Sequence, residues 1–274
     1  MSEGRSRYED LKGWFNGKRV AVAFSGGVDS TVVALAAHEG LGEDAAAFTA
    51  ETIFSSGGDI EVAKAVAGIL GIRHFVVQVR LPKRVASNPP DRCYLCKKTI
   101  MRSIKRNGRM LGFDMVVDGT NMDDMRLDRP GIRAIMEAGI RSPLAELGIG
   151  KAEVREMLKQ RGLEHDRPSS PCAATRFPVG EKITPEGVRT VNEAESFIKG
   201  LGFRQVRVRV HGNMARIELD PPEIGRMTNE KLRSAIVGRL RGLGFDRVAL
   251  DMEGYSTGPM DAAEVSRRDK RSLW

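Results

Sequence analysis

Residues 25–30, SGGVDS, combine residue types that bind phosphate, and they stand between two apolar runs. A strand, a tight turn and a helix are expected there in that order. Paired glycines allow a turn whose backbone N–H groups point one way, and the helix N-terminus adds partial positive charge. Ser25, Ser30 and Thr31 add hydroxyl donors. Asp29 would repel phosphate unless it holds a Mg²⁺ that bridges the phosphates. The stretch predicts a phosphate-binding loop with Asp29 as the magnesium ligand.

Three cysteines form the second group with chemical potential: Cys93 and Cys96 in the run CYLC, and Cys172 far downstream. Three thiols are too few for a disulfide framework. A structural zinc site would need a fourth ligand from one of the four histidines. A cubane iron-sulfur cluster with one iron free of protein ligands also fits three thiols. Unremarkable thiols, or a redox pair that protects Cys172, are the alternatives.

Basic residues concentrate in one segment. Between positions 80 and 109 there are ten Lys or Arg against a single acid, Asp91, in a chain whose net charge is +8. A solvated helix face, a phosphate-bearing ligand and RNA are each compatible with such a run.

The composition is that of an ordinary globular protein: 274 residues, 41% hydrophobic and 29% charged. No apolar run approaches the roughly 20 residues that span a bilayer, and the start MSEGRSRYED has no signal-peptide core. A cytoplasmic location without membrane contact is expected.

Alternating elements are predicted to position these residues in the first half of the chain. Apolar β-branched strands alternate with helical patterns, which is typical of an α/β fold with a doubly wound, mainly parallel sheet. The expected strands are 19–24, 45–48, 72–79 and 114–117, and the expected helices are 28–39, 59–70, 94–110 and 150–161.

The second half predicts a smaller α+β domain. Residues 163–187 carry four prolines and read as a long loop around Cys172, followed by a helix at 185–199 and strands at 204–210 and 215–219. A helix at 229–243, a strand at 247–251 and a frayed basic tail at 266–274 complete the chain. The predicted divisions are a nucleotide-binding domain at 1–165, the cysteine loop at 166–184 and a substrate or oligomerisation domain at 185–274.

SGGVDS resembles the PP-loop of the ATP pyrophosphatases, whose members cleave ATP between the α and β phosphates and adenylate a substrate oxygen. Further motifs, running in order through nearly the whole chain, resemble the LarE family. They are NPPDRCYLCKK (88–98), DGTNMDD (118–124), RPGIRA (129–134), RSPLAELG (141–148), RPSSPCAATRFPVG (167–180), VRVRVHG with ARIEL (206–219) and LDMEGY (250–255).

The resemblance implies an ATP-dependent sulfur transferase of nickel-pincer nucleotide biosynthesis. Its substrate would be a pyridinium biscarboxylic acid mononucleotide, adenylated at each carboxylate and converted to thiocarboxylates. Cys172 matches the position at which the family supplies sulfur. The implied cofactor is a 4Fe-4S cluster on Cys93, Cys96 and Cys172 that carries an extra sulfide of unknown source; the alternative is sacrifice of the Cys172 sulfur. Homo-oligomers, commonly hexamers, are implied by the same analogy.

The candidate site residues fall into three groups. For ATP and Mg²⁺ they are Ser25, Gly26, Gly27, Asp29, Ser30, Asn121 and Asp124. The last two follow a strand at the carboxyl edge of the sheet, and helix capping is their alternative role. Arg207 and Arg209 are expected on one strand face for the substrate phosphate, or else on an exposed face without a ligand. Arg176 is a catalytic candidate or a partner in a loop salt bridge. Glu218 and Asp220 would position a metal or form ion pairs with the arginines.

Three other functions use parts of the same pattern. A tRNA thiolase would share the loop and the cysteines, but no added zinc CxxC pairs or separate RNA-binding module are found, so RNA is an unlikely partner. An amidotransferase-type synthetase would need a glutaminase. A nucleotide-binding module without activity would leave Cys172 without a role.

Overall fold

A computed structural model describes residues 6–126, 130–166 and 172–255 and divides the chain into two compact units. Unit 1 comprises Met1–Leu81 and Asp91–Ser169, and unit 2 comprises Pro82–Pro90 and Ser170–Trp274. The predicted tail at 266–274 lies outside the described residues. Within the described ranges, no helix is both long and apolar enough to cross a membrane.

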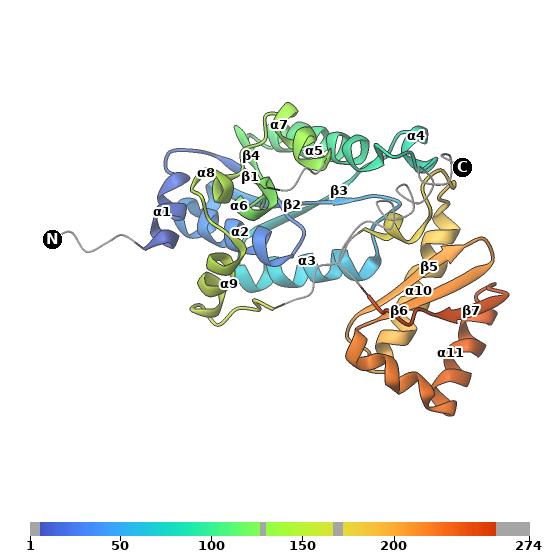
Figure 1. The fold of residues 1–274 in the computed structure, drawn as a ribbon. Coiled ribbons are helices and arrows are strands. Elements are labelled where there is room, and N and C mark those ends of the chain that lie inside the picture. Colours follow the sequence, from blue (N-terminus) through green and yellow to red (C-terminus); the bar gives the residue numbers. More distant parts are fainter. Residues whose placement is uncertain (1–5, 127–129, 167–171, 256–274) are drawn as a thin grey trace, which may run out of the picture. The chain divides into compact units, whose positions relative to one another are not determined.

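Unit 1 is built on a four-stranded parallel sheet in the order β3-β2-β1-β4 (Figure 1). Its strands are β1 (Val20–Ala23), β2 (Ala45–Glu51), β3 (Arg73–Gln78) and β4 (Met115–Val117). Val22 lies opposite Ala47 of β2 and Val117 of β4, so the loop that leaves β1 starts in the interior of the sheet. The predicted α/β class is confirmed.

Helices cover both faces of this sheet, as a doubly wound fold requires. One face packs with α1 (Arg7–Trp14), α2 (Val28–Leu41), α3 (Gly57–Leu70) and α9 (Lys151–Lys159) around a core that contains Val22, Val33 and Leu158. The other face packs with α5 (Arg92–Met110) and α7 (Pro130–Glu137) around Phe48, Ile104 and Ile135. Shorter elements of unit 1 are η1 (Gly42–Asp44), α6 (Met122–Met125) and α8 (Pro143–Glu146).

Unit 2 contains the separate three-stranded sheet β5-β6-β7. Strands β5 (Val206–His211) and β6 (Met214–Leu219) pair antiparallel, and β7 (Arg247–Leu250) pairs parallel to β6. Helices α10 (Pro185–Gly200) and α11 (Glu230–Gly242) contribute Ile198, Ile236 and Leu240 to its core. The other elements are α4 (Lys83–Ala86), η2 (Ala173–Arg176) and η3 (Pro221–Thr228).

Residues 82–90 lie inside the first predicted domain, yet they group with unit 2. Asn88 is completely buried and donates through Nδ2 to the carbonyls of Phe177, at 3.2 Å, and Pro178, at 2.6 Å. The Gly180 and Ile183 N–H groups donate to the carbonyls of Asn88 and Ala86. These bonds join 82–90 to a stretch nearly ninety positions away, which local sequence patterns do not reveal.

Candidate functional site

The loop after β1 has the geometry expected of a phosphate cradle. Gly26 has φ +71°, and Gly27 is the N-cap of α2 without a side-chain cap, so the first N–H groups of the helix have no intrahelical acceptor. Ser30 Oγ donates to the Gly27 carbonyl at 3.0 Å and lies 3.1 Å from Ser25 Oγ. Gly27 N–H donates to Ser25 Oγ at 3.3 Å. The side chains of the two serines therefore stabilise the turn through hydrogen bonds within it.

Asp29 lies in the first turn of α2 and is held by Asn121, which donates from Nδ2 to Asp29 Oδ1 at 2.9 Å. Burial raises the pKa of Asp29 above its ordinary value of 3.8; the Asn121 hydrogen bond opposes this shift, and the charge of Asp124 adds to it. An anion in a half-buried position near a second carboxylate is a suitable ligand for a divalent cation.

Asn121 has the helix-capping role considered for it, and its role in binding ATP or Mg²⁺ stays a prediction. Its Oδ1 accepts from the Asp124 N–H at 2.9 Å and so caps α6, while its Nδ2 reaches Asp29. Asp124 forms an ion pair with Lys151 of α9, at 3.0 Å. The carboxyl edge of β1 and β4 thus brings Asp29, Asn121 and Asp124 together within unit 1.

Gly119 makes this approach possible, because a Cβ there would lie 2.7 Å from Ser30 N and 2.9 Å from Asp29 C. We expect Gly119→Ala to reduce the free energy of unfolding by about 1–3 kcal/mol and to displace the start of α2. Gly68→Ala in α3, where a Cβ meets nothing within 4 Å, is the control and is expected to be neutral or stabilising. Urea unfolding of both variants checks this; equal stabilities would contradict the argument.

Cys93 and Cys96 lie in the first turns of α5, where a spacing of three residues puts both thiols on one face. Cys93 is exposed and Cys96 is half-buried, and the Arg92 guanidinium lies 3.9 Å from Cys93 Sγ. Neither thiol is part of the core, which is what ligands for an external group require.

Cys172, the third cysteine, is exposed and stands at the N-cap of η2 in unit 2. Arg176 ends this turn and donates from Nη1 to the Cys172 carbonyl at 3.2 Å. The same guanidinium makes a two-point ion pair with Glu195 of α10, at 2.8 and 3.0 Å, and both side chains are buried. Arg176 therefore takes part in the loop ion pair considered for it. Its catalytic role stays a prediction.

The strand arginines lie on a buried face rather than an exposed one. Arg209 donates to the Thr175 carbonyl at 2.6 Å and to Glu218 Oε1 at 3.0 Å. Arg207 stacks 5.0 Å from the Tyr255 ring centroid, and burial together with the charge of Arg176 lowers its pKa. Strand β5 thus directs both arginines toward the segment that follows Cys172.

Glu218 also accepts a hydrogen bond from Arg216 at 3.1 Å. It therefore pairs with arginines, which is one of the two roles expected for it. Asp220 follows β6 and begins η3. Over the ranges the structure describes, no group of three or more His, Cys, Asp or Glu is arranged to hold a metal ion.

Glu195 was not identified from the sequence, yet it joins three elements: it pairs with Arg176 and accepts from the Val208 N–H at 3.0 Å. We expect Glu195→Gln to cost about 3 kcal/mol of unfolding free energy, because it leaves a buried guanidinium without its counter-charge. Glu193→Gln, two positions away in an exposed pair with Arg239, should cost less than about 1 kcal/mol. Urea titrations test the difference; losses of equal size would show that the buried pair is not what stabilises the turn.

Comparison with known proteins gives a consistent assignment. The asparagine synthase family model matches residues 16–103. The chain is 42% identical to an uncharacterized protein of Synechocystis sp., over 93% of this chain and 97% of that protein. It is 34% identical to the pyridinium-3,5-bisthiocarboxylic acid mononucleotide synthase of Lactiplantibacillus plantarum, over 89% of each chain. A tRNA-specific 2-thiouridylase of Roseiflexus sp. is 26% identical over 93% of this chain.

The family model covers the loop that holds Asp29, and the similarity to the Lactiplantibacillus synthase extends through unit 2. Conversion of a carboxylate to a thiocarboxylate needs both ATP and a sulfur donor, and the chain has a glycine turn at a helix N-terminus and three cysteine thiols. The protein belongs to the LarE family of ATP-dependent sulfur transferases.

Proposed function

We propose that this enzyme converts the two carboxylates of a pyridinium biscarboxylic acid mononucleotide into thiocarboxylates, as a step in nickel-pincer nucleotide biosynthesis. The name of the Lactiplantibacillus relative, a pyridinium-3,5-bisthiocarboxylic acid mononucleotide synthase, supports the substrate class. The observation that carries the proposal is the Asp29–Asn121 contact at the start of α2, which orients a carboxylate beside a helix N-terminus with unfilled donors.

The first step activates a poor electrophile. A substrate carboxylate oxygen attacks the α-phosphorus of ATP, pyrophosphate leaves, and an acyl adenylate forms. Gly26, Gly27 and the first N–H groups of α2 hold the phosphates of ATP, while Ser25 and Ser30 maintain the turn. A bound Mg²⁺ would neutralise phosphate charge during this step. Asp29 is its proposed ligand, and Asn121 and Asp124 complete the polar edge.

The second step delivers sulfur to the activated carbonyl carbon, and AMP leaves. Cys93, Cys96 and Cys172 are the proposed ligands of a 4Fe-4S cluster, and their full or partial exposure suits this role. Such a cluster would supply a labile sulfide at its fourth iron. Sacrifice of the Cys172 sulfur is the second candidate, favoured by the exposure of that thiol at the start of η2.

Unit 2 is the proposed substrate and oligomerisation domain. Arg207 and Arg209 are proposed to attract the substrate phosphate: a dianion would offset the cost of burying Arg207 beside Arg176, the same cost that lowers its pKa. Arg209 and Arg176 also hold the carbonyls of the Cys172 turn, so substrate and sulfur sites would share one hydrogen-bonded frame. Assembly into hexamers is proposed by analogy with the family alone.

The test uses full-length protein purified and reconstituted without oxygen. Iron and acid-labile sulfide are measured first, and then pyrophosphate and thiocarboxylate are followed after addition of MgATP and the pyridinium biscarboxylic nucleotide. About four irons per chain, with repeated turnover while sulfide is supplied, is the expected result. No iron, with Cys172 converted to dehydroalanine, would select the sacrificial route. Pyrophosphate release that depends on tRNA instead of the nucleotide would overturn the proposal.

A further inference from the structure

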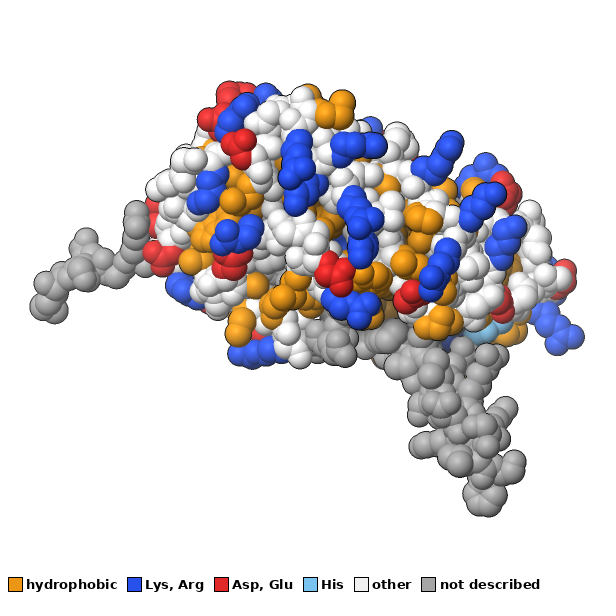
Figure 2. Space-filling view, turned by 90° about the horizontal axis from the view of Figure 1, so that it is seen from above, with side chains coloured by type: hydrophobic (Ala, Val, Ile, Leu, Met, Phe, Trp, Pro, Cys, Tyr) orange, Lys and Arg blue, Asp and Glu red, His pale blue; other side chains and the backbone are white. Residues whose placement is uncertain are grey.

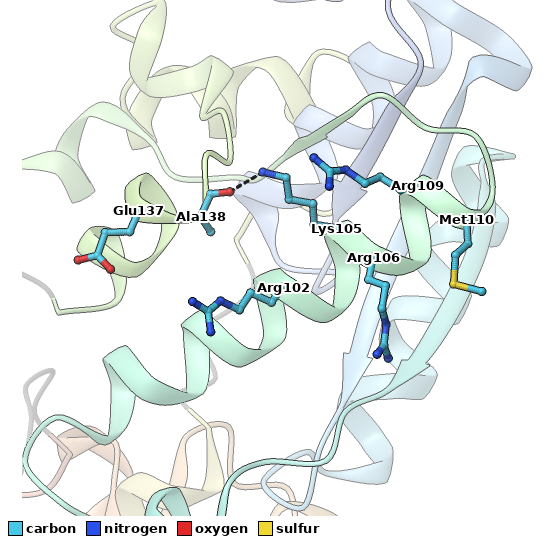
Figure 3. A pocket seen from close by; sticks show the side chains of 7 residues that line it. All are labelled: Arg102, Lys105, Arg106, Arg109, Met110, Glu137 and Ala138. Atoms are coloured by element: carbon cyan, nitrogen blue, oxygen red, sulfur yellow. Dashed lines mark hydrogen bonds between the residues drawn. The ribbon is translucent and has the colours of Figure 1, made fainter.

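A groove of about 510 Å³ lies between α5 and the end of α7 (Figure 3). It is lined by Arg102, Lys105, Arg106, Arg109, Met110, Glu137 and Ala138. Lys105 is anchored by a 2.8 Å hydrogen bond to the Ala138 carbonyl, which ties the two helices together along the floor of the groove. Figure 2 shows Lys and Arg side chains spread over this side of the molecule, with hydrophobic side chains between them.

Among the residues that the structure describes, no acidic partners balance the three arginines of the groove. Helix α5 contains seven basic residues and no acidic one. Arg102, Arg106 and Arg109 are exposed and recur at i, i+4 and i+7, which places them in one row. Among the described residues, no carboxylate lies within ion-pairing distance of these three. Glu137 is already engaged by Lys98, at 2.8 Å.

Helix stability does not account for the row. Like charges at i, i+4 destabilise a helix by a few tenths of a kcal/mol per pair. Cations are favoured by the helix dipole in the last turn only, where Arg109 lies. Arg102 and Arg106 lie further from the C-terminus and gain little from it. The exposed row is therefore hydrated by water and is open to pairing with an external anion.

The surroundings of the groove indicate what carries that anion. Met110, which lines the groove, exposes 78% of its surface, and Leu111, the next residue, exposes 47%. Met136, which precedes the lining residue Glu137, exposes 64%. No aromatic side chain lines the groove, so it offers no platform for stacking bases. Arginine and methionine together are enriched in protein interfaces. A second copy docked through this same face would oppose like charges, which disfavours a symmetric contact of the groove with itself.

We propose that the α5–α7 groove is a docking surface for an acidic amphipathic segment of a partner protein. Carboxylates of the segment pair with Arg102, Arg106 and Arg109, and its apolar side chains cover the exposed methionines. The groove lies on the helix that begins with Cys93 and Cys96. A partner held there is bound to the same rigid element as two of the three thiols. The proposal does not depend on the substrate assigned above.

The test measures fluorescence anisotropy of a labelled alanine-based helical peptide with glutamates at i, i+4 and i+7 beside leucines, at low ionic strength. The wild-type chain is compared with Arg102→Glu/Arg106→Glu/Arg109→Glu. The matched control, Lys231→Glu/Arg233→Glu/Arg241→Glu on α11, makes the same change in net charge at three other exposed positions. Pyrophosphate release is assayed in parallel, so that failure of the proposed function is seen separately.

We expect the α5 variant to bind the peptide at least about tenfold more weakly and the α11 control to change by less than about twofold. A peptide with glutamine in place of glutamate should bind no better than the α5 variant does. Equal weakening in both variants would overturn the proposal, because it would reflect net charge alone. Binding of a single-stranded RNA through the three arginines, with no binding of the peptide, would also overturn it.

Discussion

Asp29→Asn is expected to lower ATP-dependent pyrophosphate release at least about a hundredfold while leaving the fold intact. The amide keeps an acceptor for Asn121 but loses the charge that would hold Mg²⁺. Pyrophosphate release with saturating MgATP and substrate measures the effect. Asp44→Asn, which removes an exposed pair with Arg19, is the control and should leave the rate unchanged. A rate within tenfold of wild type would mean that Asp29 is not the metal ligand.

The same substitution has a defined effect on stability. Because burial raises the pKa of Asp29, its contribution to folding is present at low pH and is lost as pH rises from 3.8 through the raised pKa. Asparagine does not ionise and avoids this loss. The variant should therefore be more stable than the wild type at pH 7, with the advantage vanishing in acid. Unfolding midpoints measured across this range test the sign; a variant less stable at pH 7 would contradict it.

Cys93→Ser is expected to reduce iron from about four per chain to nearly none and to stop repeated thiocarboxylate formation. Pyrophosphate release should persist, because the loop that holds Asp29 is formed by other elements of unit 1. The exposed position of Cys93 leaves no cavity on substitution. Iron analysis and product assays on anaerobically reconstituted protein give both readouts.

Cys96→Ser and Cys172→Ser should reproduce the loss of iron if all three thiols are ligands. Ser103→Ala, on the same helix, is the matched control and should retain iron. Loss of pyrophosphate release together with iron would show that the cysteines maintain the fold, contrary to the separation of the two steps.

The fold was largely predictable because its signals are local. The apolar runs at 19–24 and 45–48 correspond to β1 and β2. Strand β2 continues to Glu51, and the predicted strand is shorter because polar side chains interrupt the apolar pattern before the strand ends. The glycine turn before α2 and the N-cap at Asn121 also followed from short-range patterns. Local pattern and tertiary structure agree at these places, so the loop was located correctly.

The arginine network was not predictable in detail. Period-two alternation placed Arg207 and Arg209 on one face, but it did not reveal that α10 and η2 bury that face. The sequence does indicate that Glu195 is unusual. It lies on the buried face of α10, where the helical period predicts an apolar residue; the other residues of this face include Val188, Val191 and Ile198. A carboxylate at such a position requires a buried cation, and Arg176 provides it.

The return of 82–90 to unit 2 has a practical consequence for dissection of the protein. A fragment that ends near residue 165 would retain this segment but lose the carbonyls that Asn88 donates to. The complementary C-terminal fragment would lack its inserted peptide and expose the backbone of 177–183. Neither fragment then contains all the contacts that it needs to fold on its own. Two-fragment complementation, with each polypeptide supplying what the other lacks, is the form in which separate expression should succeed.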